Sequence, residues 1–425
     1  MLDKPAGVKP PPRSAAGVFR FTKIERNKSM KYSNVAMPLG GTWSSPFARW
    51  QGSLAEVSSI DLAVTVTARA LHDRRVDPAE ISGLVLGWTV PQPEMFYGAP
   101  TVAGRLGAIG VSGPMVSQAC ATSVASLNVA AGAVMSGTGL QLVIATDRTS
   151  NGPSLTYPAP SRQGGAPEIE NWVLDNFDLD PWAGNSMIFA GEAVAKEMGI
   201  SRNELDELTA LRWQQYADSL ADNRAFQHRY IVPVEIPRKK GEALVLDADE
   251  GVRPKGIESI AKLRPVLPDG VHTFAAQTHP ADGCAGAIVT TVEQARELSG
   301  GEGMVRLLGA GFARVSKSRM PMAPVPAALS ALDAANKDIK DLAAITTHNP
   351  FAVNDLYFSA QTGIAVDAMN IHGCSLIFGH PQGPTGLRSI AELVETLRER
   401  GGGIGLFTGC AAGDTGAALV LEVTD

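Results

Sequence analysis

The sequence predicts an α/β protein built from two copies of one unit, with a long segment inserted into the first copy. Two observations predict this arrangement. From residue 32 onward, segments of helix length alternate with short apolar runs, which is the pattern of a layered α/β fold. In addition, residues 301–425 repeat the order of elements in residues 32–149 and 273–300. Two such units would pack sheet against sheet through shared helices, and a site would lie between them.

The first copy alternates predicted helices and strands. Residues 58–76 have a helical pattern that ends at Asp77 and Pro78, and the apolar run 81–90 is predicted to be a strand. Residues 122–135 form a predicted helix so rich in small residues that we expect it to be buried. The strand after it is predicted at residues 141–147.

The later chain repeats this plan. Residues 324–350 match the helix, turn and strand of the first copy, and residues 380–410 match its loop, helix and strand around residue 120. Residues 273–293 and 405–423 are each predicted to contain a strand, a turn and a closing strand. Asp282 and Asp414 would serve those turns at matching points of the repeat.

The segment 150–272 interrupts the repeat and is predicted to cover something. It opens with the loop-rich stretch NGPSLTYPAPSRQGGAPE and continues with a helical pattern at residues 185–199. A second helix is predicted to begin after Ser201, because Glu204 three residues later completes a capping box.

Residues 1–31 are predicted to be a basic N-terminal extension. The stretch is broken by prolines and holds only Asp3 and Glu25 as acidic residues up to residue 29. A transit peptide is an alternative, but the prolines oppose the amphipathic helix that such a peptide needs.

The composition excludes several classes of function. The chain of 425 residues is 44% hydrophobic and 19% charged, with a net charge of −6. This balance gives no general attraction to nucleic acid or anionic membrane, and no run of about 18 apolar residues could span a bilayer. The four cysteines are too few for a disulfide framework and indicate a reducing compartment, so we expect a cytoplasmic protein.

The sequence predicts no metal site. A zinc site from the four cysteines is conceivable, but none of them forms a C-x-x-C pair, and His372 and Cys374 are too close in the chain for ordinary ligand spacing. The cysteines are Cys120, Cys284, Cys374 and Cys410.

Cys120 lies where a predicted strand becomes a predicted helix. It is either a small buried hydrophobe or a nucleophile, because amides and the dipole at a helix N-terminus favour a thiolate. Three other polar motifs also fall at turns, where rigid scaffolds carry catalytic groups. They are THNPF at 347–351, GHPQGPTG at 379–386 and GCAAGDTG at 409–416.

Together these motifs make the chain resemble the thiolase family from about residue 33 to its end. The family has a Cys-x-Ser loop, an Asn/His-Glu-Ala-Phe loop, a Gly-His-Pro loop and a Cys-x-Gly loop. The matching residues here are CAT at 120–122, HNPF at 348–351, GHP at 379–381 and CAA at 410–412. The resemblance implies two βαβαβαββ halves in a layered α-β-α-β-α core, with residues 150–272 as an inserted coenzyme-A-binding loop domain. It implies Claisen condensation of acyl-CoA, or the reverse cleavage, as in fatty acid metabolism.

The resemblance also implies a role for each motif residue. Cys120 would carry the acyl group, and Cys410 would move the α-proton of the second substrate. His380 would hold the Cys120 thiolate and donate to the enolate oxygen, which His348 would also support, with or without a bridging water. The backbone amides of Cys120 and Ala412 would form the oxyanion hole. The family further implies substrate contacts from Met187, Arg253, Thr278, Met320 and Phe351, and coenzyme A as substrate with no other cofactor.

The sequence departs from the family at three points. Asn349 replaces the glutamate of the second loop, and Pro350 follows it. Ala412 replaces a glycine, so its amide can donate only if the backbone needs no positive φ there. Gln277-Thr278-His279 replaces an Ala-Ser-Gly segment. A histidine in place of asparagine at position 348 makes the chain resemble the degradative and sterol-carrier-protein-like branches of the family more than the short-chain biosynthetic ones.

Two alternatives to a thiolase stay open at this point. A ketoacyl-synthase-like condensing enzyme would share the fold, although such relatives use no second cysteine like Cys410. A thiolase-like subunit could instead bind acyl-CoA without turnover and support a partner subunit. The family resemblance implies a homodimer or homotetramer, because pairing would hide the exposed strand edges.

Overall fold

A computed structural model describes residues 28–424, apart from residues 160, 162, 239 and 253–255. Most of the predicted N-terminal extension lies outside the described residues. Its last four residues, 28–31, form a strand that pairs antiparallel with a strand of the C-terminal half.

The first half of the chain forms a six-stranded sheet in the order β3-β12-β7-β5-β6, with β4 also paired to β12. β12 runs antiparallel to both β3 and β7, whereas β7, β5 and β6 are parallel. The strands are β3 (Thr42–Ser44), β4 (Ala48–Arg49), β5 (Gly83–Gly87), β6 (Met115–Val116), β7 (Gln141–Arg148) and β12 (Ala281–Val289).

The second half forms a sheet with the matching order β1-β13-β16-β15-β14, with β2 also paired to β13. β16 is antiparallel to β13 and β15, and β15 is parallel to β14, which is the pattern of the first sheet. The strands are β1 (Lys28–Lys31), β2 (Ala36–Met37), β13 (Met304–Arg314), β14 (Leu342–His348), β15 (Gly403–Ala411) and β16 (Thr415–Thr424).

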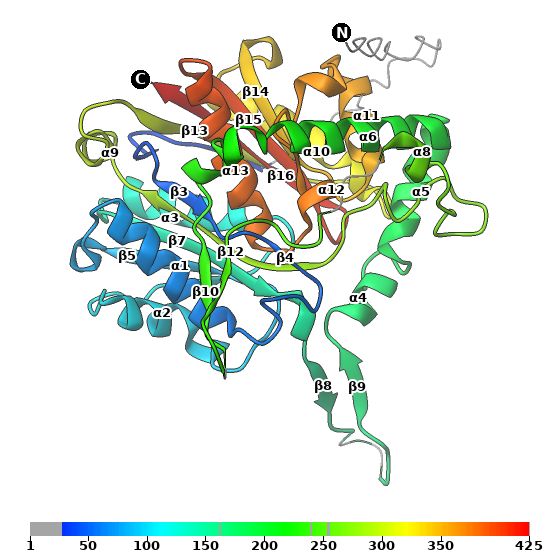
Figure 1. Cartoon of the computed structure of the whole chain (residues 1–425), viewed down its shortest axis with the longest axis horizontal. Helices are drawn as coiled ribbons and strands as arrows, with labels where there is room; N and C mark the ends of the chain where they lie inside the picture. Colours follow the sequence, from blue (N-terminus) through cyan, green and yellow to red (C-terminus); the bar gives the residue numbers. More distant parts are fainter. Residues whose placement is uncertain (1–27, 160, 162, 239, 253–255, 425) are drawn as a thin grey trace.

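Helices separate and cover the two sheets in five layers (Figure 1). α3 (Thr122–Met135) and α13 (Pro384–Glu399) contact each other and strands of both sheets, so they form the middle layer. α1 (Ser59–Asp73) and α2 (Gly98–Leu106) cover the outer face of the first sheet, and α10 (Pro324–Ala335) covers the second. The predicted layered α-β-α-β-α fold and its buried small-residue helix are confirmed. In α3, residues 122–127 are all buried, as a helix between two sheets requires.

The duplication is close but not complete. The first half follows the predicted order: β3, α1, β5, α2, β6, α3, β7 and β12. In the second half the third strand is reduced to one bridge between Ile345 and Met369. Met369 comes between α11 (Ala352–Thr362) and α13 in the sequence. The remaining helices of this half and its border are α9 (Val292–Leu298) and α12 (Ser375–Phe378).

One predicted turn is wrong. Asp282 lies inside β12, and residues 273–280 form no strand before it. The reason is the insertion, which joins β7 to β12 where a turn at residues 412–414 joins β15 to β16. Asp282 and Asp414 still have related tasks, since Asp282 accepts the Ser150 amide at 2.9 Å and Asp414 accepts the Ser318 amide at 2.9 Å.

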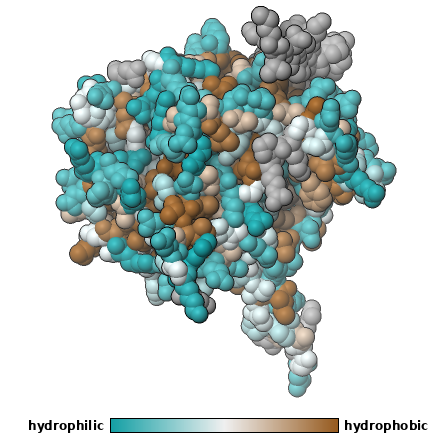
Figure 2. All heavy atoms as spheres, in the orientation of Figure 1, coloured by the Kyte–Doolittle hydropathy of each residue, from teal (hydrophilic) through white to brown (hydrophobic). Residues whose placement is uncertain are grey.

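The insertion carries small elements along one side of the molecule. Its hairpin of β8 and β9 projects away from the body at the lower edge of Figure 1, and Figure 2 shows apolar and hydrophilic residues interspersed over this face. The capping box of Ser201 and Glu204 is present at the start of α6. The elements are β8 (Ser154–Tyr157), β9 (Glu168–Asn171), α4 (Leu174–Asp178), α5 (Met187–Met198), α6 (Arg202–Asp218), α7 (Ala221–Arg224), β10 (Val234–Ile236), β11 (Leu244–Leu246) and α8 (Ile257–Ile260).

None of the helices in the described part of the chain has the length and apolar character needed to cross a bilayer.

Candidate active site

Cys120 and His380 meet between the two halves. The Cys120 sulfur lies 3.0 Å from Nε2 of His380, although the two residues are 260 positions apart. Cys120 comes just before Ala121, the N-cap of the middle-layer helix α3, and His380 follows the short helix α12. Ala119 has a φ of +45°, a left-handed conformation that is strained for alanine and turns the chain sharply before the cysteine.

The His380 ring is fixed from its other side. Its Nδ1 lies 2.6 Å from Oγ1 of Thr385, near the start of α13. With Nδ1–H donated to that hydroxyl, Nε2 is left as a lone pair facing the Cys120 thiol. His380 can then take the thiol proton when the sulfur attacks a carbonyl carbon.

His348 lies beside this pair. Its ring centroid is 4.2 Å from that of His380, and its Nδ1 is 2.8 Å from Oγ of Ser375. Its Nε2 is buried and has no hydrogen-bond partner among residues 28–424 as far as they are described. One nitrogen of each histidine and the Cys120 sulfur all lie within 4.8 Å of one another.

A buried ionic network supports the loop of His348. Asp355 on α11 accepts from Oγ1 of Thr347 at 2.7 Å and from Nδ2 of Asn349 at 2.6 Å. Arg212 of α6 pairs with the same carboxylate at 2.8 Å, and both side chains are almost fully buried. Because a buried carboxylate needs a paired charge, the insertion helix α6 helps to hold the loop of residues 347–349. This network also explains the neutral Asn349, whose amide can donate to Asp355 as a glutamate could not.

Cys410 approaches the same place from β15. Its sulfur accepts an N–H bond from Nδ2 of Asn354 at 3.2 Å, and it lies near enough to Cys120 for a thiolate there to raise the pKa of Cys410. The backbone amides of Cys120 and Ala412 both donate toward the Cys120 sulfur. Ala412 is not among the described residues with positive φ, whereas Gly413 has a φ of +78° and makes the turn instead. The condition for an alanine at this position is therefore met.

Burial dominates the electrostatics of the site. It raises the pKa of the Cys120 thiol to about 12, although the amides of Ala412 and Cys120 oppose the rise. It likewise raises the pKa of Cys410 and lowers the pKa of His348 to about 3. The pKa of His380 is lowered by burial and then by the nearby His348. The expected thiolate at the helix start is thus replaced by a neutral thiol beside two neutral imidazoles, because loss of water outweighs the helix dipole.

The neutral His348 should make stability depend on pH. In the unfolded chain His348 takes up a proton below about pH 6.5, whereas in the folded chain it stays neutral down to about pH 3. Stability from this group is therefore lost as the pH falls through that window, by about 1.4 kcal/mol per pH unit at most. The raised pKa values of Asp147 and Glu392, both about 7, act in the opposite direction, so the measurement must be a difference.

Denaturant unfolding of the wild type and of His348→Asn, each between pH 4 and pH 7, gives that difference. We expect the wild type to lose more stability on acidification than the variant does. Equal slopes for the two proteins would contradict a buried, neutral His348.

Four of the five predicted substrate-binding residues lie in the described part of the chain. Met320 and Phe351 are buried in one hydrophobic cluster with Cys410, and Met187 at the start of α5 packs against that cluster. Thr278 lies beside the second loop, since its amide donates to the Pro350 carbonyl at 2.7 Å. Arg253 lies outside the described residues.

Sequence reasoning missed several residues that hold the site. Asp147 at the end of β7 accepts from the Gly383 amide at 2.9 Å and so anchors the loop after His380. Asn354, Ser375, Asp355 and Arg212 were also missed, since none belongs to a motif with its own chemistry. Thr385 could have been found, because it is the hydroxyl residue of the GHPQGPTG motif.

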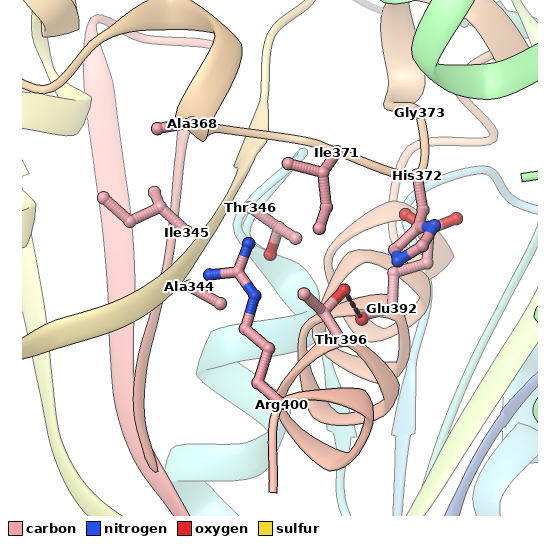
Figure 3. Close-up of a pocket in the computed structure, with 10 residues that line it drawn as sticks. All are labelled: Ala344, Ile345, Thr346, Ala368, Ile371, His372, Gly373, Glu392, Thr396 and Arg400. Carbon is pink, nitrogen blue, oxygen red and sulfur yellow. Dashed lines mark hydrogen bonds between the residues drawn. The ribbon is translucent and has the colours of Figure 1, made fainter. Parts of the chain in front are cut away.

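The other two cysteines and an internal cavity are apart from this chemistry. Cys284 lies in β12 within the core of the first half, and Cys374 is buried at the start of α12. Figure 3 shows a cavity of ≈ 10 Å³ beside α13, where the Thr396 hydroxyl donates to the Glu392 carbonyl. The cavity has room for about one water molecule and not for a substrate.

Comparisons with known proteins agree with the geometry. Residues 41–293 match the family model "Thiolase, N-terminal domain" and residues 302–423 match "Thiolase, C-terminal domain". The β-ketoadipyl-CoA thiolase of Pseudomonas knackmussii is 32% identical over 393 residues, covering 89% of this chain and 96% of the relative. A probable acetyl-CoA acyltransferase of Staphylococcus epidermidis is 28% identical and covers 90% of this chain and 98% of the relative.

Solved structures agree as well. The acetyl-CoA acetyltransferase of Syntrophomonas wolfei superposes with a TM-score of 0.84 at 27% identity, covering 92% of this chain and 100% of that one. The human mitochondrial 3-ketoacyl-CoA thiolase has the same fold, with a TM-score of 0.84 at 23% identity over 92% of this chain and 99% of that one. Two family models, a relative above 30% identity and a shared fold lead to one conclusion: the chain belongs to the thiolase family.

Proposed function

We propose that this enzyme, a thiolase-type acyl-CoA C-acyltransferase, cleaves 3-ketoacyl-CoA with coenzyme A, or runs the reverse Claisen condensation, through an acyl group on Cys120. The observation that carries the proposal is the 3.0 Å contact between the Cys120 sulfur and Nε2 of His380, with Cys410 close by.

In the first half-reaction the Cys120 sulfur attacks the 3-keto carbon and its proton passes to His380. The bond between C2 and C3 then breaks, and the leaving enolate of acetyl-CoA takes a proton from the Cys410 thiol. The amides of Cys120 and Ala412 stabilise the oxyanion of the tetrahedral intermediate. The buried, neutral groups supply this proton traffic without holding a charge in the resting site.

In the second half-reaction coenzyme A attacks the Cys120 thioester. The proton of the incoming thiol returns to Cys410, and Cys120 recovers its own proton from His380 as the new acyl-CoA leaves. The two steps use one nucleophile and one acid–base thiol, and the proton that Cys410 gives to the enolate is replaced by the proton of the coenzyme A thiol.

We propose that the insertion, residues 150–272, is the loop domain that binds coenzyme A. Two contacts tie it to the site. Asp180 accepts the Gly413 amide at 3.0 Å, within the turn that follows Cys410, and Arg212 anchors Asp355. Met187, Met320, Phe351 and Thr278 would then line the path of the acyl chain and pantetheine.

We also propose a homodimer or homotetramer in the cytoplasm. β6 is a two-residue edge strand next to the Cys120 loop, and pairing such edges across a twofold axis would satisfy their backbone groups. A molar mass equal to that of one chain, measured by light scattering at micromolar concentration, would contradict this assembly. The four free cysteines support a reducing compartment.

The test is CoA-dependent cleavage of a series of 3-ketoacyl-CoA substrates that differ in chain length. Cleavage is monitored as the loss of absorbance from the enolate form of the 3-ketoacyl-CoA substrate. We expect cleavage of at least one chain length by the protein alone. Activity that appears only with an added partner would favour the partner-dependent subunit, and condensation that requires a malonyl donor would favour the ketoacyl-synthase-like enzyme.

A further inference from the structure

We propose that Cys120, His348 and His380 together form a binding site for a thiophilic divalent cation of the zinc class, and that a cation bound there blocks acyl transfer. The block rests on the proposed function, whereas the binding needs only the geometry of the three side chains.

The three donor atoms lie close to the spacing that zinc needs. Zinc binds sulfur at about 2.3 Å and imidazole nitrogen at about 2.0 Å, so two ligands of a tetrahedral ion are roughly 3.3–3.6 Å apart. Here the Cys120 sulfur and Nε2 of His380 are 3.0 Å apart, and all three donor atoms lie within 4.8 Å of one another. Side-chain shifts of about 1 Å would complete the site.

Each imidazole is already oriented as a metal ligand would be. Zinc-bound histidines usually bond their second ring nitrogen to an outer group that fixes the ring and the tautomer. Nδ1 of His348 lies 2.8 Å from Oγ of Ser375, and Nδ1 of His380 lies 2.6 Å from Oγ1 of Thr385. Nε2 of His348 is the independent sign of a ligand, because it is buried and unpartnered in the described part of the chain.

The hydrogen bonds of the two rings also suit a metal. Each Nδ1 faces a hydroxyl, which leaves Nε2 of each histidine as the donor atom. Binding forms one sulfur–metal bond, releases the single proton of the Cys120 thiol to solvent and transfers no electron. Affinity should therefore rise about tenfold per pH unit between pH 6 and pH 8. A water molecule would fill the fourth position, since the Cys410 sulfur is held by Asn354.

The same sulfur cannot bind a metal and an acyl group together. A thioester sulfur is a poor ligand compared with a thiolate, so acylated protein should not bind the cation. Conversely, the metal would occupy the lone pairs with which Cys120 attacks and His380 accepts a proton.

The experiment titrates the full-length, metal-free protein with Co²⁺, whose thiolate complexes absorb in the near ultraviolet, and then displaces it with Zn²⁺. We expect one equivalent, a sulfur-to-cobalt band and the tenfold rise in affinity per pH unit. The band should vanish in Cys120→Ala and persist in the control Cys284→Ala, whose thiol is buried elsewhere. His348→Asn should lower the affinity by at least about 10²-fold and Ser375→Ala by roughly 10- to 100-fold.

The same samples are then mixed with acetyl-CoA, with and without Zn²⁺. Zn²⁺ should prevent labelling of Cys120, and a chelator should restore it. No thiolate band, a band that survives Cys120→Ala, or an affinity unchanged in His348→Asn would overturn the metal site. If the metal-free protein is acetylated while no metal binds, the metal inference fails and the proposed function stands. If the metal binds but no acyl-CoA labels the protein, the metal site stands and the proposed function fails.

Discussion

Replacing Cys120 with alanine is expected to reduce acyl transfer by at least about 10⁴-fold, because no other thiol can form the acyl-enzyme. Cys410 is buried and accepts a hydrogen bond from Asn354, which places it for proton transfer rather than attack. The measurement is steady-state cleavage of 3-ketoacyl-CoA. Cys120 is only partly buried, so the small change to alanine should leave the fold intact.

The matched control is Cys284→Ala, which removes a thiol from the core of the first half. It should retain wild-type turnover. Turnover within tenfold of wild type in Cys120→Ala would mean that Cys120 is a packing residue and that the nucleophile lies elsewhere.

Replacing Cys410 with alanine is expected to separate the two half-reactions. The nucleophile and His380 stay in place, so acylation of Cys120 by acetyl-CoA should persist. Condensation or cleavage needs a proton at the α-carbon and should fall by at least about 10²-fold, the low end for lost acid–base catalysis. Single-turnover acylation and steady-state turnover, measured side by side, give the two rates.

His380→Ala is the comparison for this split. Because His380 contacts the Cys120 sulfur, both rates should fall in that variant. Normal turnover in Cys410→Ala would make the second cysteine structural and would assign the chemistry to a different condensing mechanism.

The sequence predicts the fold well where local patterns and the repeat agree. Residues 122–135 are α3 with the predicted bounds, and the small residues that predicted its burial lie between the two sheets. The capping box of Ser201 could also be predicted, because it depends only on two residues three positions apart. The motif loops predicted Cys120, His348, His380 and Cys410, which the structure brings to one region.

Long-range contacts could not be predicted. Asp355 is 143 residues from Arg212, so no local pattern connects the insertion with the loop of His348. The direction of the Cys120 pKa shift could not be predicted either. The helix start beside Cys120 favours a thiolate, and only the folded surroundings show that burial raises the pKa by more than the backbone amides lower it. The turn predicted at Asp282 is wrong because the two halves differ at this point. The second half has a turn between its last two strands, whereas the first half has the insertion there.

The most direct test of the account is rapid mixing of the protein with acetyl-CoA, with no second substrate, followed by intact-mass analysis and peptide mapping. We expect one acetyl group per chain, located on Cys120, in the wild type and in Cys410→Ala. A label on Cys284, Cys374 or Cys410, or a label that persists in Cys120→Ala, would contradict the assignment of Cys120 as the acyl carrier.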